Sequence, residues 1–229
     1  METIVAMPRV PEWDNLEICE QALATPRKRG QFLKGLMAAS AGLAAAAAVG
    51  PAASALASTA RGSAAIPQGD IDILNFALTL EWLERTFYEQ AMLHVPFKQS
   101  NVRRLAQTLR GDEITHTVAL TAAVKSASTA PPVGRAPHYN FPAGVFQTQS
   151  SFLALSEALE DTGVHAYLGQ AGNILTPSIL LTAATIVTVE ARHAGAIRYQ
   201  NGKAPTSGPF DTGFTKDQVL AVAGPLIGS

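Results

Sequence analysis

Apolar residues recur at intervals of three and four along four stretches of the chain, with polar residues between them. This is the period of an amphipathic helix that buries one face. The stretches cover residues 70–95, 102–125, 150–171 and 177–199. The pattern therefore predicts four helices that pack their apolar faces together, as in a four-helix bundle.

Local signals predict where these helices begin and end. Asp70 precedes the first apolar run and is expected to cap that helix, and Pro96 is expected to end it. Gly172 and Asn173 suit the end of the third helix, and Pro177 suits the first turn of the fourth.

Several glycines lie inside the predicted helices, where each costs roughly 1 kcal/mol relative to alanine. We expect Gly111, in the second helix, to have a packing reason. Gly163 and Gly169, in the third helix, are expected to allow close approach of another backbone segment.

The connection over residues 126–145 is rich in proline and glycine and has no helical period. It is longer than the roughly two to eight residues that join antiparallel neighbours, so we expect it to cross the bundle. Residues 201–229 should form a tail that packs on the bundle, with a short helix from Thr215. The expected fold is all-α: a four-helix bundle over residues 70–200, one long crossover between helices 2 and 3, and a short C-terminal helix.

Residues 1–57 are predicted to be an export leader, and residues 58–69 a linker. A basic cluster is followed by a soft apolar run over residues 36–49, and Ala55-Leu56-Ala57 fits a small-residue cleavage site. Residues 29–34 resemble a twin-arginine signal in which Gly30 takes one arginine position. An uncleaved membrane anchor is the alternative, which the weak hydrophobicity disfavours. We therefore expect a periplasmic or extracellular protein carried by the twin-arginine translocase.

Charge and cysteine content exclude some classes of protein. The 17 Lys and Arg residues nearly balance the 18 Asp and Glu residues, so no basic face for nucleic acid is expected. The single cysteine, Cys19, excludes an intramolecular disulfide framework and a cysteine-rich zinc site.

The apolar faces of the predicted helices also carry acids and histidines. Glu113 and His116 are one helical turn apart and project together, as do Glu190 and His193. The first and third helices add glutamates in or beside the buried stripe, at Glu81, Glu84, Glu157 and Glu160. Such groups cost free energy in a core unless something pairs with them.

Two Glu-x-x-His helices and two helices with inward glutamates are the ligand pattern of a di-metal carboxylate site in a bundle. Oxygen and nitrogen ligands together suit iron, manganese or, less specifically, zinc. The alternative is a bundle without metal that keeps its acids as buried ion pairs, with Arg85, Arg192 or Arg198 as partners.

Several segments resemble a known family: LNFALTLEWLE at 74–84, FY at 87–88, LEDTGVHAYLG at 159–169, VEARHA at 189–194 and PFDT at 209–212. On these residues the chain, from Ile71 to about Tyr199, resembles the ferritin-like superfamily. It is most similar to the exported bacterial ferritin-like proteins related to plant desiccation-related proteins. The resemblance implies a ferritin-like bundle with two iron or manganese ions.

The resemblance also implies roles for six side chains. The terminal ligands would be Glu81 and Glu160 and the bridging acids Glu113 and Glu190, and one histidine would cap each ion, His116 and His193. The ligand set is a firmer implication than the division into roles.

Glu81 is preferred to Glu84 because bacterioferritin and rubrerythrin have a tyrosine two turns after the ligand glutamate, which fits Tyr88. By helical angle, Glu84 is nearer the centre of the stripe. Tyr88 is expected either to hydrogen-bond a ligand or to pack as a core residue. The side chains held in reserve are Glu84, Glu157, Asp112 and His165.

Three functions are consistent with these patterns. The first is an oxidoreductase of ferroxidase or peroxide-scavenging type, in which two iron or manganese ions meet dioxygen or peroxide in metal oxidation or in oxidative or desiccation stress. The second is a non-catalytic stress or structural protein that keeps the scaffold. The third and weakest is storage in a ferritin-type shell, because the leader, the long connection and the tail give no sign of shell contacts. A homodimer is the assembly considered, and a monomer or dimer by light scattering would exclude a shell.

Overall fold

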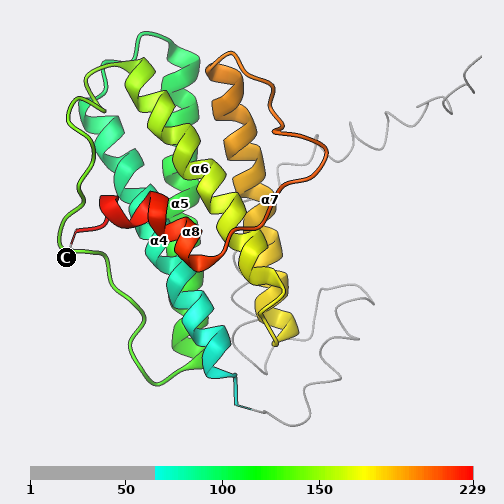
Figure 1. The fold of residues 1–229 in the computed structure, drawn as a ribbon. Coiled ribbons are helices and arrows are strands. Elements are labelled where there is room, and N and C mark those ends of the chain that lie inside the picture. Colours follow the sequence, from blue (N-terminus) through cyan, green and yellow to red (C-terminus); the bar gives the residue numbers. More distant parts are fainter. Residues whose placement is uncertain (1–64, 229) are drawn as a thin grey trace, which may run out of the picture. The chain divides into compact units, whose positions relative to one another are not determined.

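The computed structural model describes residues 65–228. The predicted leader (1–57), Cys19 and most of the predicted linker lie outside the described residues. The helices are α4 (Gln68–His94), α5 (Ser100–Ala127), α6 (Gln149–Ala171), α7 (Pro177–Gln200) and α8 (Lys216–Ala223), followed by the short 3-10 helix η1 (Gly224–Leu226). The predicted all-α fold is confirmed (Figure 1).

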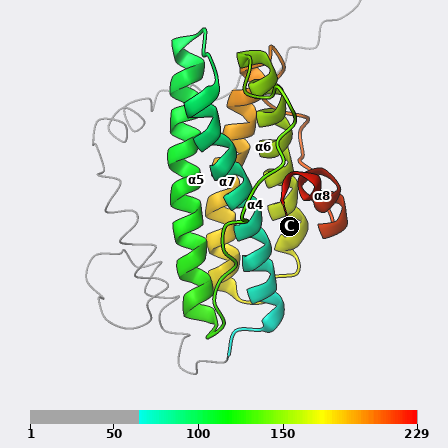
Figure 2. The same ribbon diagram turned by 90° about the vertical axis from the view of Figure 1, so that its left-hand side faces the viewer.

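The four long helices form a bundle of two antiparallel hairpins. α4 packs mainly on α5, and α6 packs mainly on α7. Between the hairpins, residues 128–148 run back along the length of the bundle, so that α5 and α6 point the same way (Figure 2). The predicted long crossover therefore lies where the sequence places it.

The C-terminal tail packs on the bundle beside α6. Thr215 caps α8 through a reciprocal pair of hydrogen bonds with Gln218. Beyond η1, Ile227 pairs with Tyr139 of the crossover in an isolated antiparallel bridge. The end of the tail is thus joined to the crossover by backbone hydrogen bonds.

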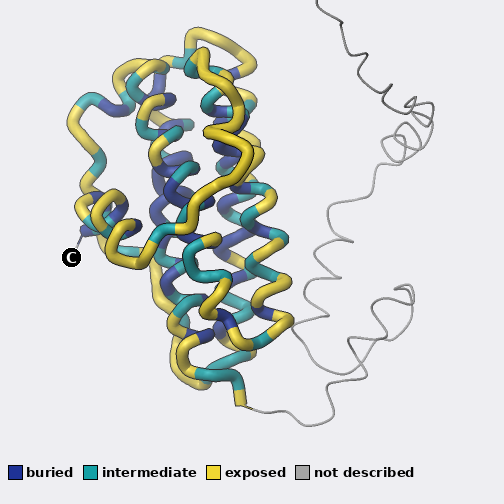
Figure 3. Tube along the Cα trace, turned by 45° about the vertical axis from the view of Figure 1, so that its right-hand side comes forward, coloured by how far each residue is buried: buried dark blue, intermediate teal, exposed yellow. Residues whose placement is uncertain are grey.

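Burial follows the interior of the bundle (Figure 3). One hydrophobic cluster, which includes Phe87, Phe152 and Val219, lies toward the end where α4 finishes. A second, which includes Leu74 and Leu120, lies toward the end where α4 begins. Along α4, Glu81 and Glu84 have residues of these hydrophobic clusters both before and after them.

None of the helices within residues 65–228 combines the length and the apolar character that crossing a membrane requires.

The predicted capping role of Asp70 is wrong. The first helix begins at Gln68 with Pro67 at its N-cap, and Asp70 lies inside the first turn. Its buried carboxylate instead accepts hydrogen bonds from the backbone amides of Leu175 (2.9 Å) and Thr176 (2.7 Å), just before α7. Asp70 therefore ties the start of α4 to the turn between α6 and α7.

The expected packing reason for Gly111 is also wrong. The residue is exposed, and a Cβ added there would meet no atom within 4 Å. Gly169 does have the expected close approach, because its backbone lies against the backbone of Phe214 in the tail.

We expect the Asp70→Asn substitution to lower the free energy of unfolding at pH 7 by about 1–3 kcal/mol, because one of the two backbone amides loses its hydrogen bond to a charged, buried carboxylate. Burial acts to raise the pKa of Asp70, but hydrogen bonds from Thr176 and Leu175 outweigh it and hold that pKa below 3.8. A carboxylate with a lowered folded-state pKa stabilises the protein above its unfolded-state pKa and loses that effect as the pH falls through the folded-state value.

Urea unfolding of both proteins at a series of pH values measures this difference. It should shrink as the pH falls below about 4. The control is Asp72→Asn, since Asp72 is exposed and pairs only with the Gln68 side chain. An equal loss in both variants would contradict the role given to Asp70.

Candidate metal centre

The six side chains predicted as ligands meet in the middle of the bundle, and all are buried. Each long helix contributes at least one of them. They are Glu81 on α4, Glu113 and His116 on α5, Glu160 on α6, and Glu190 and His193 on α7. Helical spacing explains this convergence, because each Glu-x-x-His pair spans one turn and follows the apolar face of its helix.

The imidazole of His116 faces three carboxylates from three helices. Its Nδ1 atom lies 2.9 Å from Oε1 of Glu190, 3.2 Å from Oε2 of Glu81 and 3.2 Å from Oε2 of Glu113. One ring nitrogen cannot make good hydrogen bonds to all three. The arrangement is that of donor atoms gathered around a common point.

The second histidine repeats this arrangement on the other side of the cluster. Nδ1 of His193 lies 3.2 Å from Oε1 of Glu113, 3.3 Å from Oε2 of Glu160 and 3.5 Å from Oε2 of Glu190. Its other nitrogen, Nε2, is 3.2 Å from Oδ2 of Asp112. Asp112 is therefore placed to orient the imidazole from outside the cluster, as carboxylates commonly do for metal-binding histidines.

Two overlapping sets of four side chains result. Within each, one ligand atom per residue lies within 4.8 Å of the others. The first set is Glu81, Glu113, His116 and Glu190; the second is Glu113, Glu160, Glu190 and His193. The sets share Glu113 and Glu190 and differ in one glutamate and one histidine each. This is the arrangement expected if the shared carboxylates bridge two cations.

Several buried oxygen and nitrogen atoms of the cluster have no hydrogen-bond partner, which also favours a bound cation. Five buried atoms of the clustered side chains lack a hydrogen bond of acceptable geometry: Oε1 of Glu113, Oε2 of Glu160, both carboxylate oxygens of Glu190, and Nδ1 of His193. Native interiors rarely leave such groups unpaired without a functional reason. Bound cations would satisfy them.

The pKa shifts show how strongly these groups interact. Burial raises the pKa of Glu113, and the Glu190 and Glu81 carboxylates raise it further. Burial also raises the pKa of Glu160, to about 7. It acts on Glu190 in the same direction, but the two imidazoles outweigh it and lower the pKa of Glu190 well below its ordinary value.

The pKa values of the two histidines also rise, but the cause is charge and not burial. Burial alone would lower their pKa values, yet the surrounding carboxylates raise the pKa of His116 and of His193 far above the ordinary value. Without a bound cation, protonated imidazoles supply the positive charge among the carboxylates. A cation binding here would have to displace them.

The arginines considered as partners in a metal-free bundle are placed elsewhere. Arg85 pairs with Glu89 (2.9 Å), and Arg198 makes two hydrogen bonds to Asp161 (2.8 and 2.6 Å). Arg192 is exposed. Among the described residues, the recorded ion pairs of the clustered glutamates are with the two histidines.

Glu157 is also placed outside the cluster. It is half-buried and binds Nζ of Lys203 (2.7 Å) and Nδ2 of Asn201 (2.6 Å). His165 lies away as well, since its ring stacks on Phe214 and contacts the carbonyl of Thr212.

Two buried tyrosines donate hydrogen bonds to the predicted terminal glutamates. The Tyr88 hydroxyl contacts Glu160 and also Ser156, so the tyrosine chosen by its spacing from Glu81 reaches a glutamate on a different helix. The Tyr167 hydroxyl donates to Oε1 of Glu81 at 2.6 Å.

Sequence reasoning missed the contact of Tyr167. The residue stands two turns after Glu160, just as Tyr88 stands two turns after Glu81. This repeated Glu-x6-Tyr spacing was the available signal. Each tyrosine binds the glutamate of the other helix.

Glu84 is a fifth buried glutamate beside the six-residue cluster, only 3% exposed. Burial raises its pKa, and the negative charges of Glu190, Glu113, Glu160 and Glu81 raise it further. The missing side chain of Gly163 leaves room for it, because a Cβ there would lie 3.2 Å from Oε1 of Glu84 and 3.8 Å from Oε2 of Glu190. The prediction that another backbone segment approaches Gly163 is therefore wrong, because the group close to Gly163 is the Glu84 carboxylate.

We expect Gly163→Ala to weaken metal binding severalfold, because the added methyl group must push the Glu84 carboxylate, which lies beside the cluster, by a few tenths of an ångström. The same change favours the helix by roughly 1 kcal/mol, so the metal-free protein should not lose stability. Metal titration by calorimetry, together with urea unfolding of the metal-free form, measures both effects. Unchanged affinity would show that the cluster does not depend on this space.

A sequence comparison supports the assignment of the fold. The profile of the family described as "Ferritin-like domain" matches residues 69–203, which span all four long helices. The chain belongs to the ferritin-like family. A search of curated proteins found no match. Family membership accounts for the bundle and is compatible with metal binding by the buried glutamates and histidines.

Proposed function

We propose that the bundle binds two iron or manganese ions and that these ions react with dioxygen or peroxide. The observation that carries the proposal is the pair of overlapping ligand sets, which share Glu113 and Glu190. In this proposal Glu81 and His116 complete one ion's ligands, and Glu160 and His193 complete the other's.

Charge supports two divalent ions over one. Four carboxylates balance two divalent cations when both histidines bind as neutral imidazoles. Carboxylates and imidazoles together suit iron and manganese, whereas all-oxygen sites suit magnesium and calcium. Purely structural zinc sites are usually tetrahedral and do not share ligands in this way.

The protein's own residues would perform three tasks. Buried helix positions hold the six ligands, and the two tyrosine hydroxyls and Asp112 orient Glu160, Glu81 and His193. The two hydrophobic clusters keep bulk water away. Two adjacent redox-active ions, when bound, can share the electrons that reduce an oxygen species.

Elemental analysis of protein purified without chelators tests the proposal. We expect iron or manganese close to two ions per chain, and a new absorption band when ferrous iron is added to metal-free protein in air. Protein that contains and takes up neither metal would contradict it.

We further propose that the protein is exported and acts in oxidative or desiccation stress, on the basis of its twin-arginine-like leader and its resemblance to desiccation-related proteins. N-terminal sequencing of the native protein in cell fractions tests export. We expect a mature chain that begins near residue 58 and lies outside the cytoplasm. A full-length chain in the cytoplasm would contradict export.

A further inference from the structure

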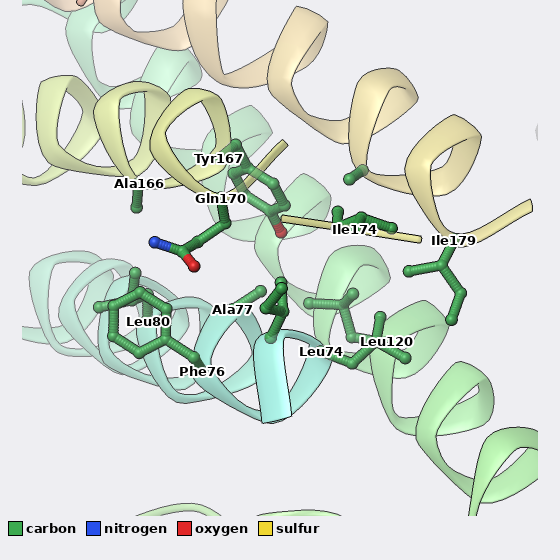
Figure 4. Close-up of a pocket in the computed structure, with 12 residues that line it drawn as sticks. Leu74, Phe76, Ala77, Leu80, Leu120, Ala166, Tyr167, Gln170, Ile174 and Ile179 are labelled. Atoms are coloured by element: carbon green, nitrogen blue, oxygen red, sulfur yellow. The ribbon is translucent and has the colours of Figure 1, made fainter. Parts of the chain in front are cut away.

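An apolar pocket, partly open to the surface, lies between the four long helices (Figure 4). All four long helices contribute to its wall, and its volume is about 20 Å³. A cavity needs about 10–15 Å³ to hold one water molecule, so this one has room for a particle of one or two heavy atoms.

The position of the pocket follows from helical spacing. Ala77 lies one turn before Glu81 on α4, and Leu120 lies one turn after His116 on α5. On α7, Ala183 lies two turns before Glu190. The pocket is therefore the next layer of the bundle interior along the axis from the cluster.

Tyr167 takes part in both the pocket and the carboxylate cluster. Its ring forms part of the pocket wall and projects from α6 toward Leu74 and Ala77 of α4 (Figure 4). Its hydroxyl is committed to Oε1 of Glu81, at 2.6 Å. Tyr167 thus contacts both the pocket and the cluster.

The chemistry of the wall restricts what can occupy the pocket. Apart from Tyr167 and Gln170, the side chains that line it are hydrocarbon. A buried water needs two to four polar partners, whereas apolar cavities stay dry and take up uncharged guests such as xenon. Hydrogen peroxide has the same need for partners as water. Dioxygen has none.

We propose that this pocket is a binding site for a small apolar molecule of the class of dioxygen, held one layer from the carboxylates, with Tyr167 in contact with both. The inference rests on the proposed function for its purpose. Of the two oxidants in the proposed function, an apolar pocket favours dioxygen and not peroxide. The binding itself requires no metal.

Crystals of the metal-free protein under xenon pressure test the binding. We expect one xenon atom among Leu74, Ala77, Leu120 and Tyr167. The Ala77→Leu substitution should fill the space and abolish xenon binding, and Ala183→Leu should do the same from the opposite helix. The control is Ala122→Leu, a half-exposed alanine of α5 outside the pocket wall, which should keep the xenon. An empty pocket in the unchanged protein, or xenon retained in both filled variants, would overturn the proposal.

A second measurement tests the choice of oxidant. With ferrous iron bound, oxidation by dissolved dioxygen should be severalfold slower in Ala77→Leu than in Ala122→Leu, while oxidation by added hydrogen peroxide and the number of bound ions stay equal. Equal dioxygen rates would overturn the link to dioxygen. Failure to bind iron would contradict the proposed function, and the xenon result would still stand or fall on its own.

Discussion

Replacing Glu160 by glutamine is expected to halve the metal content of the protein. Glu160 belongs to only one of the two ligand sets, so the set of Glu81, Glu113, His116 and Glu190 keeps all of its members. Glutamine has nearly the same shape, and its amide oxygen can still accept the hydrogen bond from Tyr88. What is lost is one negative charge and a carboxylate oxygen, which hard cations prefer to an amide. Metal analysis after loading with ferrous iron or manganese measures the change.

A matched control stands one turn away on the same helix. Glu157 is also a glutamate of α6, but it binds Lys203 and Asn201 outside the cluster. Glu157→Gln should therefore bind as much metal as the unchanged protein. Equal metal loss in both variants, or full metal content in Glu160→Gln, would contradict the assignment of Glu160.

A large loss of stability is expected from Gly169→Ala. A Cβ at this position would lie 1.8 Å from the carbonyl oxygen of Phe214 and 2.7 Å from its carbonyl carbon. Because backbone atoms cannot turn aside as a flexible side chain can, α6 and the tail must separate locally. That would disturb the hydrogen bond from the Phe214 amide to the His165 carbonyl (2.9 Å).

The free energy of unfolding of Gly169→Ala should fall by about 1–3 kcal/mol, as for other overpacked sites, even though alanine favours the helix by roughly 1 kcal/mol. Gly111→Ala is the control, because it makes the same change in an open, exposed part of a helix. That variant should gain roughly 1 kcal/mol. Urea unfolding of the metal-free proteins measures both, and a Gly169→Ala protein as stable as Gly111→Ala would show that the tail does not pack there.

Most of the fold could be predicted because it follows from local patterns. Helical periodicity placed the four long helices within a few residues, and proline and glycine content placed the crossover. Asp70 shows where this reasoning fails. An acid near a helix start usually caps its own helix, but this carboxylate satisfies two amides more than 100 residues away, a partner that no local pattern reveals.

The candidate site divides in the same way. Residues one turn apart on an apolar face must project together, so sequence spacing alone paired Glu113 with His116 and Glu190 with His193. The choice between neighbouring glutamates came from family resemblance, and the structure places Glu81 and Glu160 in the cluster and Glu157 outside it. Helical angle placed Glu84 in the buried stripe, and the structure buries it beside the cluster. The space that Gly163 leaves for it on another helix could not be predicted from local spacing.

The sequence by itself determined the helices, their apolar faces and the acids and histidines on those faces, since these depend on contacts within a few residues. Only the tertiary structure decided which helix lies against which. This packing brings Glu113 and Glu190 into both ligand sets and places Tyr88 and Tyr167 against glutamates of each other's helix. It also leaves an apolar pocket between the four helices. The reason is physical: side chains far apart in the chain acquire a common environment only when packing brings their helices together.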